Sequence, residues 1–217
     1  MPITNLQLRH ANITLVYKEL NFDVVSIDGL RRLLPQGTRP VITEFPADVI
    51  VVQYPNGILL QFLNRRLRLD DPSSRSITES PLPAMMAKAH EACSQTDLVA
   101  YGYNYDVTFT LPDVSDAGAH LAKRFLKEPN EIATRLGGKI IRLNLELVYP
   151  INDVQYSLRF EQPGTSDTIV AHLNAHYVEN SIPKEESMRQ QFIQHYHTLC
   201  GVLEDLFSWR DENVSNS

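Results

Sequence analysis

The chain has 217 residues, of which 43% are hydrophobic and 21% are charged. This composition is typical of a folded globular protein and argues against extensive disorder. The formal net charge is −6, and the arginine clusters at 31–32 and 65–68 have acidic residues close by. Because nucleic-acid binding depends on clustered, uncompensated Lys and Arg, we expect no nucleic-acid partner.

The sequence has no features of a membrane or secreted protein. No apolar run approaches the ~18–20 residues that a membrane-spanning helix needs, so we expect no membrane partner. The first residues lack the basic start and apolar core of a signal peptide. The two cysteines, Cys93 and Cys200, are too few for a disulfide framework. These observations predict a cytoplasmic protein.

In the first half of the chain, alternation of apolar and polar residues predicts a strand at 3–17. The dipeptide Asn56-Gly57 lies between two apolar runs and predicts a hairpin at 48–63, because both residues tolerate the positive φ of a tight turn. The other expected elements of this half are a helix at 29–34, a strand at 66–69, a polar loop at 70–80 and a helix at 83–93.

The second half begins with the clearest alternation in the sequence. Tyr101, Tyr103 and Tyr105 share one face of a strand with later apolar residues, while Asn104 and Asp106 lie on the other. This pattern predicts a sheet with one face on the core and one face in water. The other expected elements are helices at 115–126 and 130–136, strands at 141–147, 154–160 and 169–177, a long helix at 181–208 and a frayed tail at 210–217.

These elements predict an α+β fold, in which an antiparallel sheet has long helices packed on one face. We expect a single compact domain at 1–209, with two similar halves at 1–96 and 97–209. Two local matches support an internal duplication. The turns at 54–57 and 149–153 each join two apolar strands, and His-x-x-Cys occurs in the closing helix of each half, at 90–93 and 197–200.

The water-facing side of the predicted sheet is the candidate binding face. Its members alternate with core residues along the strands: Asn104, Asp106, Arg142, Asn144, Glu146, Gln155, Arg159, His172, Asn174 and His176. If the strands are adjacent, these side chains form a polar binding surface or a cleft that contains an acid, a base and an arginine. The alternative is an ordinary solvated face with cross-strand ion pairs.

The two His-x-x-Cys pairs, His90 with Cys93 and His197 with Cys200, contain the ligand types of a Cys2His2 zinc site. They are far apart in the sequence without a familiar zinc spacing, so we interpret the cysteines as small buried hydrophobic residues and predict no metal or cofactor. His172 and His176 lie on a strand, where their side chains are about 13 Å apart and cannot share an ion. The common nucleotide-binding and nucleophile motifs are missing, so we assign no catalytic residue and favour a non-enzyme.

The run Tyr101-Gly102-Tyr103-Asn104-Tyr105, together with Leu203 and Phe207 in the last helix, resembles uncharacterised bacterial α+β proteins with a Tyr-Gly-x-Asn-Tyr central strand. The resemblance covers about a tenth of the chain and implies no function.

Three functions are compatible with these patterns. The first is a protein-interaction or scaffold module, self-associating as a homodimer, which uses exposed sheet surface and a long helix. The second is a small-ligand-binding protein with an aromatic cavity between sheet and helix, lined by Tyr101, Tyr103, Tyr105, Tyr156 and Tyr177. The third is a hydrolase or metal enzyme that uses the polar face.

Overall fold

The structure is a computed structural model of the chain. It describes residues 3–20, 27–33, 41–45, 49–93, 97–112, 114–137, 143–162 and 167–208, without the side chains of 27, 42–45 and 93. In this part of the chain, 9 strands form one sheet in the order β2-β3-β4-β5-β1-β6-β9-β8-β7, and every neighbouring pair is antiparallel. The strands are β1 (Thr4–Tyr17), β2 (Val41–Phe45), β3 (Val49–Gln53), β4 (Leu59–Leu63), β5 (Arg66–Asp71), β6 (Leu98–Thr110), β7 (Leu145–Ile151), β8 (Val154–Glu161) and β9 (Thr168–Tyr177).

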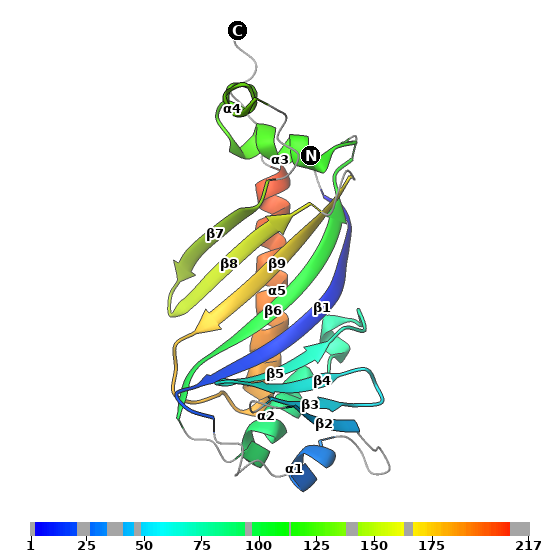
Figure 1. Cartoon of the computed structure of the whole chain (residues 1–217), viewed down its shortest axis with the longest axis vertical. Helices are drawn as coiled ribbons and strands as arrows, with labels where there is room; N and C mark the ends of the chain where they lie inside the picture. Colours follow the sequence, from blue (N-terminus) through cyan, green and yellow to red (C-terminus); the bar gives the residue numbers. More distant parts are fainter. Residues whose placement is uncertain are drawn as a thin grey trace.

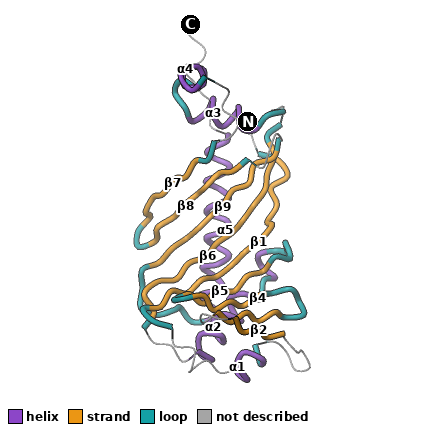
Figure 2. The backbone as a smooth tube through the Cα atoms, in the orientation of Figure 1, coloured by secondary structure: helices purple, strands orange, loops and turns teal. Residues whose placement is uncertain are grey.

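The helices leave one face of the sheet uncovered. They are α1 (Ile27–Arg31), α2 (Leu82–Cys93), α3 (Ala117–Phe125), α4 (Pro129–Leu136) and α5 (Glu185–Ser208), with a short 3-10 helix at Ile77–Glu79. Figure 1 views the sheet from the uncovered face, with α5 running behind the strands and α3 and α4 beyond one end. The tube in Figure 2 shows the same two layers. The predicted α+β architecture, an antiparallel sheet with long helices on one face, is confirmed.

The core lies between the sheet and its helices, and α5 covers the strands of the second half. From Tyr101 onwards in β6 and throughout β9 the odd-numbered residues are buried, and the even-numbered residues are mostly half-buried on the other face. On α5 the buried residues recur every three or four positions, as in Met188, Phe192, His195 and Leu199, which is the spacing of one helix face. Burial of each large apolar side chain contributes about 1.5–3 kcal/mol, so this layer is the main apolar contact that holds α5 on the sheet.

The strand order is mirrored about the β1–β6 pair. From β1 outwards the sheet continues with β5, β4 and β3, and from β6 outwards it continues with β9, β8 and β7. The turns at 54–57 and 149–153 connect equivalent strand pairs, and the two His-x-x-Cys motifs lie in α2 and α5, which contact each other. Both local matches therefore fall at equivalent places, while the duplication itself stays a prediction.

Several predicted boundaries differ from the structure. β5 continues to Asp71, whereas we expected a loop from residue 70; Asp70 and Asp71 are buried because basic side chains contact both. Asp116, and not Ser115, caps α3 by accepting a hydrogen bond from the Ala119 backbone. The start of the strand predicted at 141–147 and the tail at 210–217 lie outside the described residues.

None of the described helices has both the length and the apolarity that are needed to cross a membrane.

Candidate functional site

The uncovered face of the sheet, which we call the open face, holds most of the predicted binding residues. Asn104 and Asp106 lie on β6, Arg159 on β8, and Glu146 on β7. The three β9 residues of the prediction, His172, Asn174 and His176, lie on the same face. Asn144 precedes β7 and is exposed, and Arg142 lies outside the described residues.

Two hollows lie next to each other on the open face. The first has a volume of about 440 Å3 and the second a volume of about 250 Å3. Four residues line both of them: Asn12, Arg68, Asn104 and Asn174. The hollows therefore adjoin each other, and together we call them the open-face groove. Six of the predicted residues line the first hollow: Asn104, Asp106, Glu146, Arg159, His172 and Asn174.

A bulge in β1 adds two side chains to this face. Leu8 pairs with Val107 and His10 pairs with Asp106, so β1 has one more residue than β6 between these two pairs. The extra residue brings Arg9 and His10 onto the open face together, where the Arg9 Nε donates a hydrogen bond to Thr108 Oγ1 at 2.9 Å. Bulges of this kind often redirect side chains at functional sites.

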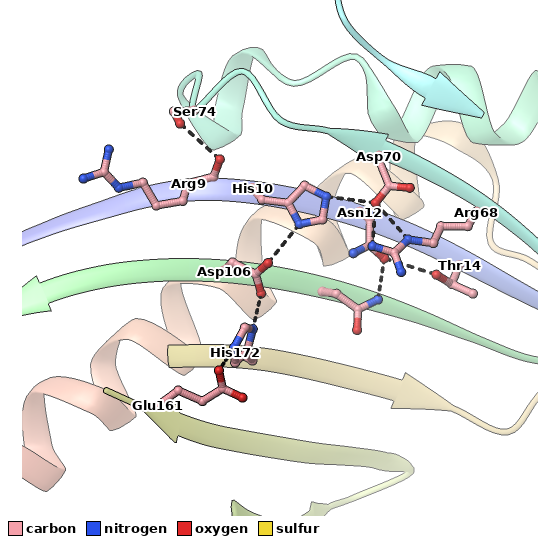
Figure 3. Close-up of polar contacts among 11 residues, drawn as sticks. Arg9, His10, Asn12, Thr14, Arg68, Asp70, Ser74, Asp106, Glu161 and His172 are labelled. Carbon is pink, nitrogen blue, oxygen red and sulfur yellow. Dashed lines mark hydrogen bonds and ion pairs between the residues drawn. The ribbon is translucent and has the colours of Figure 1, made fainter. Parts of the chain in front are cut away.

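An alternating chain of charges crosses five neighbouring strands beside the groove (Figure 3). At its centre, Asp106 receives hydrogen bonds from His10 Nδ1 at 3.0 Å and from His172 Nδ1 at 2.7 Å. On one side, His10 Nε2 donates to Asp70 Oδ1 at 2.8 Å. The remaining ion pairs are Arg68–Asp70 at 2.7 Å, His172–Glu161 at 3.4 Å and Arg159–Glu161 at 3.1 Å.

The carboxylates favour the protonated form of both histidines of this chain. Hydrogen bonds to Asp106 and then to Asp70 raise the pKa of His10 to about 9. The hydrogen bond to Asp106 also raises the pKa of His172 above its ordinary value. Burial alone would raise the pKa of Asp106, but the hydrogen bonds from His10 and His172 outweigh it and hold that pKa well below its usual range. At neutral pH His10 is therefore a cation between the carboxylates of Asp70 and Asp106, and the carboxylates beside His172 favour its cation in the same way.

This arrangement leaves the histidines little capacity for acid–base catalysis. A general base must have a free nitrogen within reach of the substrate proton and a pKa near the working pH. Both ring nitrogens of His10 donate to carboxylates, and both nitrogens of His172 face carboxylates. The chain of charges thus holds its side chains in place and sets the electrostatic potential of the open face, and is poorly suited to proton transfer.

A row of three amides crosses the floor of the groove next to the charged chain. Asn174 Nδ2 donates to Asn104 Oδ1, and Asn104 Nδ2 donates to Asn12 Oδ1, both at 2.7 Å. The hydroxyl of Thr14 donates to the same Asn12 oxygen at 3.1 Å. Because the direct pairs Asn12–Asn104 and Asn104–Asn174 are also register pairs of the sheet, the backbone fixes the positions of the amides.

The His-x-x-Cys residues lie elsewhere. His90 on α2 shares a 2.7 Å hydrogen bond with the Tyr17 hydroxyl, and the side chain of Cys93 lies outside the described residues. On α5, His197 is exposed while Cys200 is buried, and burial raises the pKa of its thiol to about 11. Within the described residues, no group of three or more His, Cys, Asp or Glu side chains is arranged to hold a metal ion.

The five tyrosines of the predicted cavity are buried between the sheet and α5. Tyr101 stacks on Tyr177 with ring centroids 4.6 Å apart. The Tyr103 hydroxyl donates to Gln191, and the Tyr105 hydroxyl donates to the Phe192 carbonyl. The Tyr156 and Tyr177 hydroxyls both bond to the imidazole of His195. These rings and hydroxyls therefore hold α5 on the sheet.

Sequence reasoning missed the part of the site that comes from the first half of the chain. Asn12 and Arg68 line the groove. Asp70 belongs to the charged chain, where it accepts a hydrogen bond from His10. A readable signal was present in β1: Leu6 and Leu8 are even-numbered, whereas the alternating residues Ala11, Ile13, Leu15 and Tyr17 are odd-numbered. Such a change of parity within one strand requires a bulge, which places His10 on the open face.

Comparisons with known proteins identify no relative: no family model matches the chain, and a search of curated proteins returned no match.

Proposed function

We propose that this protein is an interaction module whose open-face groove binds an extended, polar segment of a partner protein. The observation that carries the proposal is that the two adjoining hollows are lined by residues of the strands β5, β1, β6, β9, β8 and β7. Neighbouring strands lie about 4.8 Å apart, so the groove crosses roughly 24 Å of sheet. An extended chain of about seven residues has this length.

The lining supports a polypeptide rather than a typical small-molecule ligand. Small-molecule sites are mostly apolar with few polar groups, whereas this groove presents amides and charges of both signs. Amides such as Asn12 and Asn174 can both donate and accept, which suits the alternating N–H and C=O groups of a peptide backbone. The cross-strand hydrogen bonds already order these side chains, so binding costs less conformational entropy.

A displayed random-peptide library tests the proposal. Peptides are selected on the wild-type protein and then measured on two tryptophan variants. Ser157→Trp fills the first hollow, which Ser157 lines, and Gln194→Trp places the same side chain on an exposed part of α5. We expect selected peptides to lose at least tenfold in affinity for Ser157→Trp and to keep their affinity for Gln194→Trp. Equal binding to both variants, or failure to select any peptide, would show that the proposal is wrong.

Self-association is a second candidate, favoured by the exposed edge strand β7. Val148 and Ile151 on this strand have exposed fractions of 56% and 44%. Pro150 lies near its end and has no N–H to donate, so strand addition at this edge is limited to the residues before it. Analytical ultracentrifugation of wild type and Val148→Lys tests this candidate: the wild type should sediment as a dimer and the variant as a monomer, and a monomeric wild type would contradict it.

A further inference from the structure

The second hollow differs from the first in its charge. The first hollow is lined by Asp106 and Glu146 together with basic residues. The lining of the second hollow contains Arg66, Arg68 and His176 but no acidic side chain. Arg68 is neutralised in part by Asp70, whereas Arg66 is exposed and makes no ion pair with any described residue. The second hollow therefore carries uncompensated positive charge.

The second hollow also contains a neutral hydrogen-bond donor, the side-chain amide of Asn12. The Oδ1 atom of Asn12 already accepts hydrogen bonds from Thr14 and Asn104. This fixes the orientation of the Asn12 amide and makes its Nδ2 a donor with no acceptor in the described part of the chain. Asn12 is only 5% exposed, so this donor is held in place by its surroundings. The Nδ2 atom is not among the buried side-chain atoms that lack a partner, so it reaches the solvent of the hollow and can donate to a bound acceptor.

Gly102 provides the space. It lies between Thr14 and His176 in the register of β1, β6 and β9 and contributes no side chain to the open face. A Cβ at this position would lie 3.2 Å from the Ala175 carbonyl oxygen and 3.4 Å from Asn174 Nδ2. Because Gly102 has no side chain, the second hollow is deeper at this position.

We propose that the second hollow binds an oxyanion, a carboxylate or a phosphate group, between Arg66 and Arg68 on one side and His176 on the other. The planar fork of an arginine guanidinium matches the two oxygens of such a group. The Asn12 Nδ2 donates a further hydrogen bond to it. This site rests on the proposed function, because the oxyanion would be a group of the partner segment that occupies the rest of the groove.

Nuclear magnetic resonance of the imidazole of His176 tests the site with simple probes. Sodium phosphate and sodium acetate are titrated separately into the full-length protein, with sodium chloride at the same ionic strength as the control. We expect a saturable shift of the His176 signals with at least one oxyanion and none with chloride. A response to phosphate alone indicates a phosphate group on the natural ligand, and a response to both indicates any carboxylate or phosphate.

Two matched variants locate the binding. Arg66→Gln should weaken the phosphate or acetate response at least tenfold, because it removes the unpaired guanidinium at the hollow. Arg32→Gln, which changes an exposed arginine after α1, should leave the response unchanged. Gly102→Ala should also weaken it, by filling the floor. A response that is absent, or that is equal in wild type and Arg66→Gln, would overturn the oxyanion site.

This result is separable from the proposed function. If peptides bind the groove and lose affinity for Ser157→Trp while no oxyanion affects His176, the interaction module stands and the oxyanion site is wrong. If phosphate or acetate binds through Arg66 but no peptide is selected, the site stands and the polypeptide ligand is wrong.

Discussion

His195 on the core face and His10 on the open face of the sheet differ in charge state. On the core face, burial lowers the pKa of His195 to about 4, and its ring bonds to the hydroxyls of Tyr156 and Tyr177. On the open face, hydrogen bonds from His10 to Asp106 and Asp70 raise the pKa of His10 to about 9. Hydroxyl partners are satisfied by a neutral imidazole, which donates through one nitrogen and accepts through the other. Two carboxylate partners require both nitrogens to donate, and therefore require the cation.

The comparison teaches that the partners of a buried histidine decide its charge more than burial does. Both side chains are largely removed from water, and burial favours the neutral form of each. For His10 the nearby carboxylates outweigh that effect. The core face is thereby a neutral layer that holds α5, and the open face is a fixed pattern of charges beside a groove.

The largest expected effect is the loss of His195. His195→Leu leaves two buried tyrosine hydroxyls without a partner, which should lower the free energy of unfolding by about 3–4 kcal/mol at pH 7. In the wild type the folded-state pKa lies below the unfolded value, so the wild type loses stability as the pH falls from about 6.5 towards 4. The cost of the variant should therefore shrink over that range in urea denaturation. Tyr177→Phe, which removes one hydroxyl, should lower the free energy of unfolding by about 1 kcal/mol. This variant replaces His195→Leu in the test if His195→Leu does not fold.

His10→Gln should show the opposite pH dependence with a smaller cost. The folded-state pKa of His10 is raised, so its stabilisation is fully present below pH 6.5 and is lost as the pH rises through about 9. We expect the variant to lower the free energy of unfolding by about 2–3 kcal/mol at pH 6 and by much less above pH 9. Denaturation of His197→Gln, at an exposed position, is the control and should change stability by less than about 0.5 kcal/mol. A cost that is the same at pH 6 and pH 9.5 would contradict the charged state of His10.

The amide row should give the smallest effect. Asn104→Ala removes the hydrogen bonds with Asn12 and Asn174, which should cost about 1–2 kcal/mol in urea denaturation at pH 7. Gln155→Ala changes an exposed amide elsewhere on the open face and should cost less than about 0.5 kcal/mol. Equal costs for these two variants would mean that the row contributes nothing beyond a solvated sheet surface.

The sequence predicted the elements and faces of the second half well. Alternation along 101–111 and 169–177 identified β6 and β9 and separated their core side chains from Asn104, Asp106 and His172. Period-2 patterning reports which side of a strand a residue occupies, and this information is local.

The contribution of the first half could not be predicted in the same way, because it depends on which strands are neighbours. Asp70 begins a polar run that contains Pro72, so it has the sequence features of a loop, and its contacts with His10 and Arg68 explain its burial within β5. The pairing of β1 with β6, which joins Asn12 to Asn104, is a long-range contact that no local pattern encodes.

The mirrored strand order makes the groove a product of the completed chain. His10 and Asn12 belong to the first half, whereas their partners Asp106 and Asn104 belong to the second, and they meet only where β1 pairs with β6. During synthesis, β1 can pair with β5 on one side, but its other side stays unpaired until β6 has left the ribosome, and such edges are prone to wrong pairing. A molecule that binds the groove would therefore stabilise only chains in which β1 and β6 have already paired.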